Sequence, residues 1–374
     1  MKKILFVSRP IAPPWDEASK NFAYHLAKET AVSNKDIEIH IMTKGVLDDL
    51  PKNVICHDVY TSSERDFGAF QKIRSVLFQL MQKNKFDIIQ YFFTPTKASS
   101  VLIDRFLKGE SKTIQTIATL REDLFSDDDI KELIFGDIVT TYSDYAKERL
   151  EGLGVNNVKK IYPGIDLSDY SPREKDENLL SEFGFSKDDF IINFTGEYIR
   201  LGAMDSVIES FIKVSKKIPN AKLSLAVRVK NEKDAKKKEA VIKELQGEGL
   251  LGRVAFHDTW HRKMSDLYNM CDISLFPVQN MYGKFDVPLA VIETMACKKA
   301  MIISDIPILQ EFSTQNNSVL ISRDNPIGLA DTIIDLFENK SKREEIAQNA
   351  ATFARENFDI KKSAQKYADL YKNL

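Results

Sequence analysis

The sequence feature that most constrains the fold is a repeated alternation of short apolar runs with longer segments of helical periodicity. This alternation is typical of parallel strands joined by crossover helices, and it predicts an α/β protein. In the first half of the chain, helices are expected at residues 21–28, 66–83 and 145–153. Strands are expected at residues 3–8, 37–43, 87–92, 113–118, 138–141 and 158–161. This set is sufficient for one doubly wound sheet.

A break at residues 162–166, Tyr-Pro-Gly-Ile-Asp, interrupts the alternation, and the polar stretch that follows has no strong strand signal. The alternation then restarts, with strands expected at residues 190–195, 222–229, 254–257, 273–277, 300–304 and 318–321. We therefore predict two Rossmann-like domains, at residues 1–165 and 166–355, and a terminal helix, 356–374, that packs back on the first domain. The cleft between the carboxyl ends of the two sheets is the expected place for chemistry.

Composition excludes several classes of function. The 374 residues include 53 Lys and Arg against 55 Asp and Glu, a formal net charge of -2, so nucleic acid is not an expected partner. The cysteines Cys56, Cys271 and Cys297 fit neither a disulfide framework nor the spacing of zinc ligands. No window approaches the roughly 18 apolar residues that a membrane span requires, and we expect a cytoplasmic protein.

Three successive segments in the second half carry a resemblance: residues 264–277, 285–296 and 302–307, supported by residues 158–166 and 194–202. Together they resemble the GT-B glycosyltransferases, specifically the retaining glycosyl transferases group 1 of the family 4 type. The resemblance spans nearly the whole chain. It implies two Rossmann-like domains facing across a cleft, an acceptor-binding N-terminal domain, a C-terminal domain for a nucleotide diphosphate sugar, and no cofactor or metal beyond that donor.

The best segment also predicts a donor site from its own chemistry. Residues 285–289 should form the turn that enters a helix near Leu289, and the first N–H groups of a helix favour an anion such as a diphosphate. Glu293 lies one turn inside, and the resemblance implies that it holds the ribose; the alternative is a solvated or dipole-stabilising residue. The predicted donor-binding residues are Gly196, Arg200, Arg228, Trp260, Lys284, Asp286, Val287, Pro288, Leu289 and Glu293.

The sequence departs from the family pattern at the donor's sugar and phosphates. Phe285 stands where the family has a first glutamate, so Asp286 is our candidate catalytic carboxylate, with helix capping as the alternative. Glu197 follows Gly196 where the family has arginine. The departing diphosphate needs fixed positive charge, for which Arg200, Arg228 and Lys284 are candidates, each with an ordinary surface role as the alternative. Trp260 would stack on the base or pack in the core.

The sequence also departs from the family pattern in the acceptor-binding domain. Arg121 stands near the place of a family histidine, and it is a candidate catalytic, substrate-positioning residue or a member of a structural salt bridge. A front-face retaining route takes the acceptor's proton with the departing phosphate oxygen and does not demand that histidine. We predict that the acceptor is contacted by Arg9, Trp15 and Ser19. For Trp15, the alternative is that it packs on the surface of the domain.

Two further signals have a structural and a functional interpretation. Asp127, Asp128 and Asp129 fit the acidic start of a helix better than a metal site. The helix at residues 66–85 is basic and amphipathic, so it either contacts a membrane peripherally or packs its apolar stripe on the sheet.

The leading hypothesis is a retaining, metal-independent transferase that moves a hexose from a nucleotide diphosphate sugar to a glycan or lipid-linked acceptor. The alternative is a non-catalytic GT-B protein that binds a sugar or nucleotide or partners an active transferase, and a sugar-nucleotide epimerase is a third. The sequence does not fix the base, the sugar, the acceptor or the oligomeric state.

Overall fold

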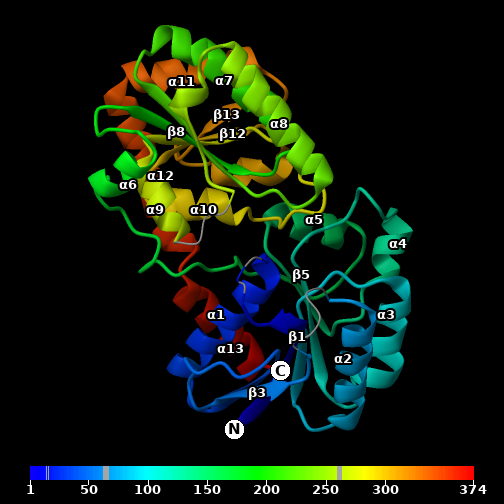
Figure 1. Cartoon of the computed structure of the whole chain (residues 1–374). Helices are drawn as coiled ribbons and strands as arrows, with labels where there is room; N and C mark the ends of the chain where they lie inside the picture. Colours follow the sequence, from blue (N-terminus) through cyan, green and yellow to red (C-terminus); the bar gives the residue numbers. More distant parts are fainter. Residues whose placement is uncertain (14, 16, 62–66, 259–262) are drawn as a thin grey trace. The chain divides into compact units, whose positions relative to one another are not determined.

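The structure, a computed structural model, describes residues 1–13, 15, 17–61, 67–258 and 263–374. The chain divides into two units, each built from discontinuous segments. The first unit comprises Met1–Ile165, Gly283–Val287 and Phe358–Leu374, and the second comprises Asp166–Tyr282 and Pro288–Asn357. Each unit contains a parallel sheet flanked by helices (Figure 1), which confirms the prediction of two doubly wound α/β sheets followed by a helical tail.

The sheet of the first unit has seven strands in the order β3-β2-β1-β4-β5-β6-β7. The strands are β1 (Lys2–Ile11), β2 (Ile37–Thr43), β3 (Val54–Asp58), β4 (Ile88–Tyr91), β5 (Lys112–Ile117), β6 (Ile138–Thr141) and β7 (Val158–Lys160). Strand β3 was missed because it is an edge strand with only Val54 fully buried, so it has no continuous apolar run. Strand β1 extends to Ile11, so Arg9, which we expected in a loop, belongs to a strand.

The helices of the first unit are α1 (Ala18–Ser33), α2 (Ala69–Met81), α3 (Lys97–Leu102), the π-helical turn η1 (Ile103–Leu107), α4 (Asp127–Glu132), α5 (Asp144–Gly152) and α13 (Ile360–Lys372). Asp66, where the second helix was expected to begin, lies outside the described residues. Helix α4 begins at Asp127 and is capped by Ser126, whose side chain accepts a hydrogen bond from the Asp129 backbone. The acidic triplet is therefore a helix start, as predicted.

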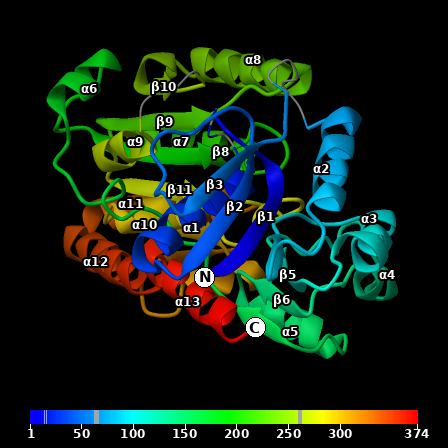
Figure 2. The same ribbon diagram turned by 90° about the horizontal axis from the view of Figure 1, so that it is seen from below.

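Helix α13 joins the end of the chain to the first unit. It lies beside α1 (Figures 1 and 2), and its side chains Tyr367 and Tyr371 are completely buried. The Tyr371 hydroxyl donates to the Gln90 side chain in β4, and the Tyr367 hydroxyl lies 3.3 Å from Thr140 Oγ1 in β6. Buried polar groups that find partners in this way fix the position of a helix on a sheet.

Helix α2 corrects one prediction. We considered it more usual for the apolar stripe of this helix to pack on the sheet, but the buried residues of α2 are Gln71, Ser75 and Gln79. Phe70, Ile73 and Leu77 are more than half exposed, whereas Val76 and Phe78 pack against the core of the first unit. The packed face of α2 thus combines these polar residues with Val76 and Phe78, and the apolar stripe that the sequence pattern assigns to the core faces solvent.

The sheet of the second unit has six strands in the order β10-β9-β8-β11-β12-β13. They are β8 (Phe190–Gly196), β9 (Ala221–Val227), β10 (Val254–Phe256), β11 (Ile273–Phe276), β12 (Ala300–Ser304) and β13 (Val319–Ile321). The chain proceeds outward in opposite directions from the adjacent strands β8 and β11. Ligands of doubly wound sheets bind beyond the carboxyl ends of the strands at such a switch point.

The helices of the second unit are α6 (Glu177–Glu182), α7 (Met204–Lys217), α8 (Glu232–Gly247), α9 (Met264–Met270), α10 (Leu289–Ala296), α11 (Pro326–Glu338) and α12 (Lys340–Asn357), with 3-10 turns η2 (Leu251–Arg253) and η3 (Pro307–Phe312). The break predicted near residues 357–359 separates α12 from α13. Within the described ranges, no helix has both the length and the apolarity needed to cross a membrane.

Candidate functional site

Glu293 is the best-defined polar group near the switch point of the second sheet. Helix α10 begins at Leu289, as predicted, and Glu293 lies one turn inside it with only 9% of its surface exposed. The Tyr268 hydroxyl of α9 donates to Glu293 Oε2 at 3.0 Å, and Tyr170 also hydrogen-bonds this carboxylate. Glu293 is therefore not a solvated residue but a carboxylate held in place by two phenols.

The two tyrosines remain protonated donors over the whole physiological range. Burial, followed by the negative charge of Glu293, raises the pKa of Tyr268 and of Tyr170 well above its ordinary value of 10. Thr195, next to the end of β8, hydrogen-bonds Tyr268 in turn. A chain of polar contacts thus connects the carboxyl end of β8 with α10, and such a chain fixes the orientation of a ligand-binding carboxylate.

A second cluster follows β8 directly. Glu197 is 8% exposed, and its Oε1 accepts hydrogen bonds from Arg200 Nη2 at 2.6 Å and from Lys230 Nζ at 3.0 Å. At the preceding Gly196, a Cβ would lie 2.5 Å from the Phe194 ring, so a side chain there would force this buried ring to move. Two cations on one carboxylate give a cluster with one net positive charge. Sequence reasoning selected Arg200 but not Lys230, because no spacing rule joins the ends of β8 and β9.

Arg228 is also exposed, and it directly follows β9. Pro288 and Leu289 form the start of α10, with Pro288 at the N-cap position. Trp260, the predicted base-stacking residue, lies outside the described residues.

His257 lies nearby in the sequence. Its ring is 4.4 Å from that of Phe183, and burial lowers its pKa from 6.5 to about 4. His257 is therefore a neutral core residue.

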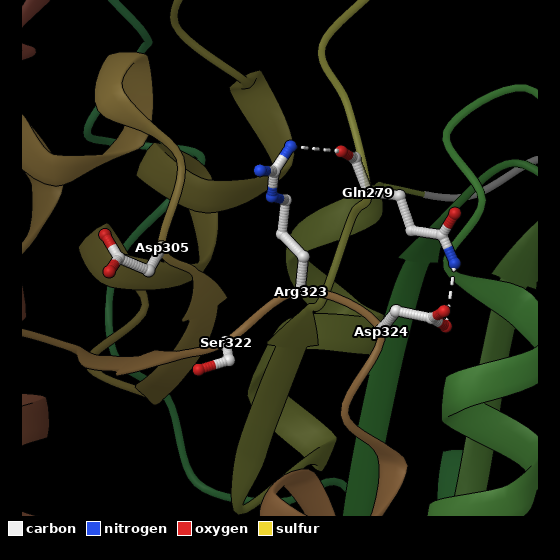
Figure 3. A pocket seen from close by; sticks show the side chains of 5 residues that line it. All are labelled: Gln279, Asp305, Ser322, Arg323 and Asp324. Atoms are coloured by element: carbon white, nitrogen blue, oxygen red, sulfur yellow. Dashed lines mark hydrogen bonds between the residues drawn. The ribbon is translucent and has the colours of Figure 1, made fainter.

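A hollow of about 550 Å³ lies at the carboxyl ends of β11, β12 and β13, and Figure 3 shows its polar lining. Its lining residues are Gln279, Asp305, Ser322, Arg323 and Asp324. The Gln279 side chain donates to Asp324 Oδ1 at 3.0 Å, and its backbone N–H donates to Leu201 at 2.8 Å. None of these residues was predicted, although each follows the end of a strand. Carboxylate, amide, hydroxyl and guanidinium groups together suit a small hydroxyl-rich ligand.

In the first unit, the segment 283–287 lies at the carboxyl end of β5. The Asp286 backbone N–H donates to the Ala118 carbonyl at 2.9 Å, and the Thr119 hydroxyl donates to the Lys284 carbonyl at 2.8 Å. The ring of Phe285 packs 4.8 Å from that of Tyr142. Phe285 therefore anchors this segment by an apolar contact at the position where the family has a glutamate.

Asp286 is 2% exposed, and its Oδ1 lies 3.4 Å from the Leu120 backbone nitrogen. Pro288 occupies the N-cap position of α10, so Asp286 precedes the cap by two residues. Among the residues predicted to bind the donor, Lys284, Asp286 and Val287 belong to the first unit, whereas Pro288, Leu289 and Glu293 belong to the second.

Arg121 forms a bidentate salt bridge with Asp123, from Nε to Oδ1 and from Nη2 to Oδ2, both at 2.8 Å. This pairing raises the pKa of Arg121 and lowers that of Asp123. The guanidinium also lies beside Gly283, where a Cβ would be 3.5 Å from Arg121 Cζ. The structure thus brings Arg121 and the segment that contains Asp286 together, although the sequence separates them widely.

The three predicted acceptor residues are spread over β1 and the start of α1. Arg9 is exposed, Trp15 is 41% exposed, and Ser19 lies in the first turn of α1. The Trp15 ring packs 4.7 Å from that of Tyr24, which matches the surface-packing alternative.

Comparisons with known proteins give one matching family, two curated relatives and several similar folds. Residues 175–353 match the family described as Glycosyl transferases group 1. MJ1069, an uncharacterized glycosyltransferase of Methanocaldococcus jannaschii, is 24% identical over 67% of this chain and 62% of its own length. MJ1178 of the same organism, also an uncharacterized glycosyltransferase, is 24% identical over 91% of both chains.

Among solved structures, HepE of Anabaena in complex with UDP and glucose superposes with a TM-score of 0.78 at 17% identity, covering 100% of both chains. At this identity the likeness concerns the fold. Together, these findings show that the chain has the GT-B fold and that residues 175–353, just under half of the chain, are similar to the glycosyl transferases group 1 family.

Proposed function

We propose that this chain transfers a hexose from a nucleotide diphosphate sugar to a glycan or lipid-linked acceptor, with retention of anomeric configuration and without a metal ion. The group 1 domain supports the reaction class, and the UDP and glucose bound by the similar HepE support a donor of this chemical class.

The observation that carries the proposal is the buried carboxylate of Glu293 on α10. A buried ionised carboxylate costs free energy unless it is paired or has a ligand to bind. The hydroxyls of Tyr268 and Tyr170 orient it from one side. A carboxylate can accept hydrogen bonds from two vicinal hydroxyls, the arrangement that a ribose offers. The start of α10, at Pro288 and Leu289, favours the adjacent diphosphate.

Arg200 and Lys230 are proposed to neutralise the departing diphosphate. Both are about half exposed, and Glu197 holds both head groups at the carboxyl end of β8. Fixed charges that need no reorganisation stabilise a developing negative charge most effectively. In the first unit, we propose that Arg121 and Asp286 position the reacting sugar or the acceptor.

The competing function is a non-catalytic protein that binds a sugar nucleotide. Glu197 favours it, because this carboxylate withdraws positive charge from Arg200 and Lys230 where an active transferase needs it. Slow hydrolysis of the donor distinguishes the two functions, since a transferase without an acceptor passes its sugar to water at a low rate.

The test incubates the full chain with radiolabelled UDP-, GDP- and ADP-sugars and measures both binding and hydrolysis. We expect one donor to be hydrolysed, and we expect Glu293→Ala to abolish the hydrolysis. Glu232→Gln on α8, where the side chain is 81% exposed, is the matched control and should retain wild-type rates. Tight binding without any turnover would establish the non-catalytic protein instead.

Two measurements on the active enzyme test the finer claims. The anomeric configuration of the product, followed by NMR from the start of the reaction, should equal that of the donor. Treatment with a chelator should leave the rate unchanged, and a rate restored only by added divalent cation would contradict metal independence.

A further inference from the structure

Helix α2 presents a continuous row of large apolar side chains to solvent. Its members have exposed fractions of 52, 55, 53, 42 and 74% for Phe70, Ile73, Leu77, Leu80 and Met81, respectively. We call these five residues the α2 stripe. Their spacing of three, four, three and one places them on one face of the helix. Exposed apolar surface gathered in this way marks an interaction site more often than an ordinary surface.

The orientation of α2 is fixed by hydrogen bonds on its opposite face. Gln71 Nε2 donates to Thr61 Oγ1 at 2.9 Å, and Gln79 Oε1 accepts from the Tyr91 hydroxyl at 3.2 Å. Turning the helix to bury the stripe would break these bonds and leave buried polar groups unsatisfied. The exposure of the stripe therefore follows from the way the helix is attached to the first unit.

The charges on α2 and on the residues that flank it in the sequence have one sign. Between Phe67 and Phe86 the chain contains four cations, Lys72, Arg74, Lys83 and Lys85, and no Asp or Glu. The three lysines are exposed, and the Arg74 guanidinium lies 5.9 Å from the Phe70 ring centroid. Apolar side chains bordered by cations match a lipid surface in which hydrocarbon lies beneath anionic headgroups. A second copy of the same face would instead oppose like charges.

The neighbouring segment also exposes apolar side chains, although its charges are mixed, since Asp104 in η1 pairs with Lys108. Val101 in α3 is 48% exposed and Phe106 in η1 is 56% exposed. Both views in Figures 1 and 2 show α2 and α3 along the same side of the first sheet. Helix α2 has 13 residues, fewer than the roughly 20 that a membrane span needs, so it suits the plane of a lipid surface.

We propose that the α2 stripe and its lysines dock the chain peripherally on an anionic membrane surface. None of the residues predicted to bind donor or acceptor lies on α2, so membrane binding can be measured whether or not the chain transfers a sugar.

The first experiment measures co-sedimentation of the full chain with vesicles of phosphatidylcholine, with and without phosphatidylglycerol. We expect at least about tenfold tighter binding to the anionic vesicles, decreasing as salt increases. The double variant Phe70→Ser/Leu77→Ser should bind at least about tenfold more weakly. Val46→Ser/Ile327→Ser is the matched control, because these apolar side chains are 78% and 59% exposed elsewhere, and it should bind like the wild type.

The lysines are tested separately. Lys72→Gln/Lys83→Gln should weaken binding to the anionic vesicles by about fivefold for each charge removed. Lys216→Gln/Lys236→Gln removes equally exposed lysines, at 70% and 71%, from α7 and α8 and should have a smaller effect. A tryptophan at position 77, introduced as Leu77→Trp, should shift its emission to the blue on adding anionic vesicles, whereas Ile327→Trp should not.

Three results would overturn the proposal. The first is no binding to anionic vesicles, and the second is binding that the stripe variant leaves unchanged. The third is concentration-dependent self-association that Phe70→Ser/Leu77→Ser abolishes in the absence of vesicle binding, which would assign the stripe to a second copy of the chain. Circular dichroism checks that every variant is folded, as the exposure of the substituted residues leads us to expect.

Discussion

Two buried side chains, one in each unit, accept a hydrogen bond from a tyrosine in nearly the same way. Gln79 of α2 accepts from Tyr91 at 3.2 Å, and Glu293 of α10 accepts from Tyr268 at 3.0 Å. The amide is neutral and serves to orient a helix. The carboxylate makes the same bond at the added cost of burying a group that ionises, although an amide would satisfy the tyrosine equally well. The comparison therefore asks whether the charge of Glu293 serves the fold or the proposed ribose contact.

We expect the largest effect on donor kinetics from a substitution of Glu293. The variant Glu293→Gln retains an acceptor for Tyr268, so its free energy of unfolding should stay within about 1 kcal/mol of the wild type. Its kcat/KM for the donor should fall about 100-fold, equivalent to about 2.7 kcal/mol, because a charged acceptor for the ribose hydroxyls is lost. Steady-state kinetics and urea unfolding measure the two quantities. A large loss of stability with unchanged kinetics would make Glu293 a structural residue.

The reverse exchange, Gln79→Glu, should affect stability and leave donor kinetics unchanged. It places a carboxyl group in a buried site where Gln79 has the neutral partners Ser75 and Tyr91, so burial should raise the folded-state pKa of the new group above its unfolded value. We expect a loss of about 2 kcal/mol at pH 7 that disappears as the pH falls below about 4, where the group is protonated in both states. Urea unfolding at several pH values tests this, with Lys72→Gln as an exposed control on the same helix.

His257 extends the comparison to a group that gains its charge on acidification. Burial lowers its folded-state pKa from 6.5 to about 4, so the unfolded chain binds the proton more readily. The stability that depends on the neutral ring is complete above pH 6.5 and is lost as the pH falls towards 4, by about 2 kcal/mol at pH 5. The loss between pH 7 and pH 5 should be smaller by that amount in His257→Gln. Equal losses in both proteins would show that His257 does not titrate in this way.

The smallest effects are expected for the tyrosines themselves. Tyr268→Phe should raise the KM for the donor about tenfold with little change in kcat, because Glu293 is less well oriented. This increase should shrink with a 2′-deoxyribose donor, which offers Glu293 one hydroxyl fewer. Tyr91→Phe is the matched change in the first unit and should cost about 1 kcal/mol of stability with unchanged kinetics. A KM that rises equally with both donors would assign Tyr268 a general structural role.

The sequence predicted most of the strands because parallel strands buried on both faces are continuous apolar runs. Strand β3 escaped detection because an edge strand lacks such a run. The orientation of α2 escaped for a different reason. Helical periodicity shows that a helix has two unlike faces, but the buried face of α2 is fixed by Thr61 and Tyr91, which supply hydrogen-bond partners from outside the helix.

The residues of the candidate site also differ in how well the sequence predicts them. Glu293 and the start of α10 could be predicted because they lie in one short motif. Lys230, the polar hollow and the proximity of Arg121 to the segment 283–287 could not, because each depends on which strand ends become neighbours. Phe285 was recorded as a missing carboxylate, and its contact with Tyr142 supplies a positive reason for the aromatic ring.

The return of α13 to the first unit has a consequence for synthesis of the protein. Gln90 and Thr140 acquire their tyrosine partners only after the second unit has been synthesised, because Tyr367 and Tyr371 follow that unit in the chain. Along the sequence, the second unit lies between residues 1–165 of the first unit and its last helix, α13. The emerging N-terminal half must therefore wait, with this polar patch uncovered, while the second sheet assembles behind it, and chaperones have most reason to act during that interval.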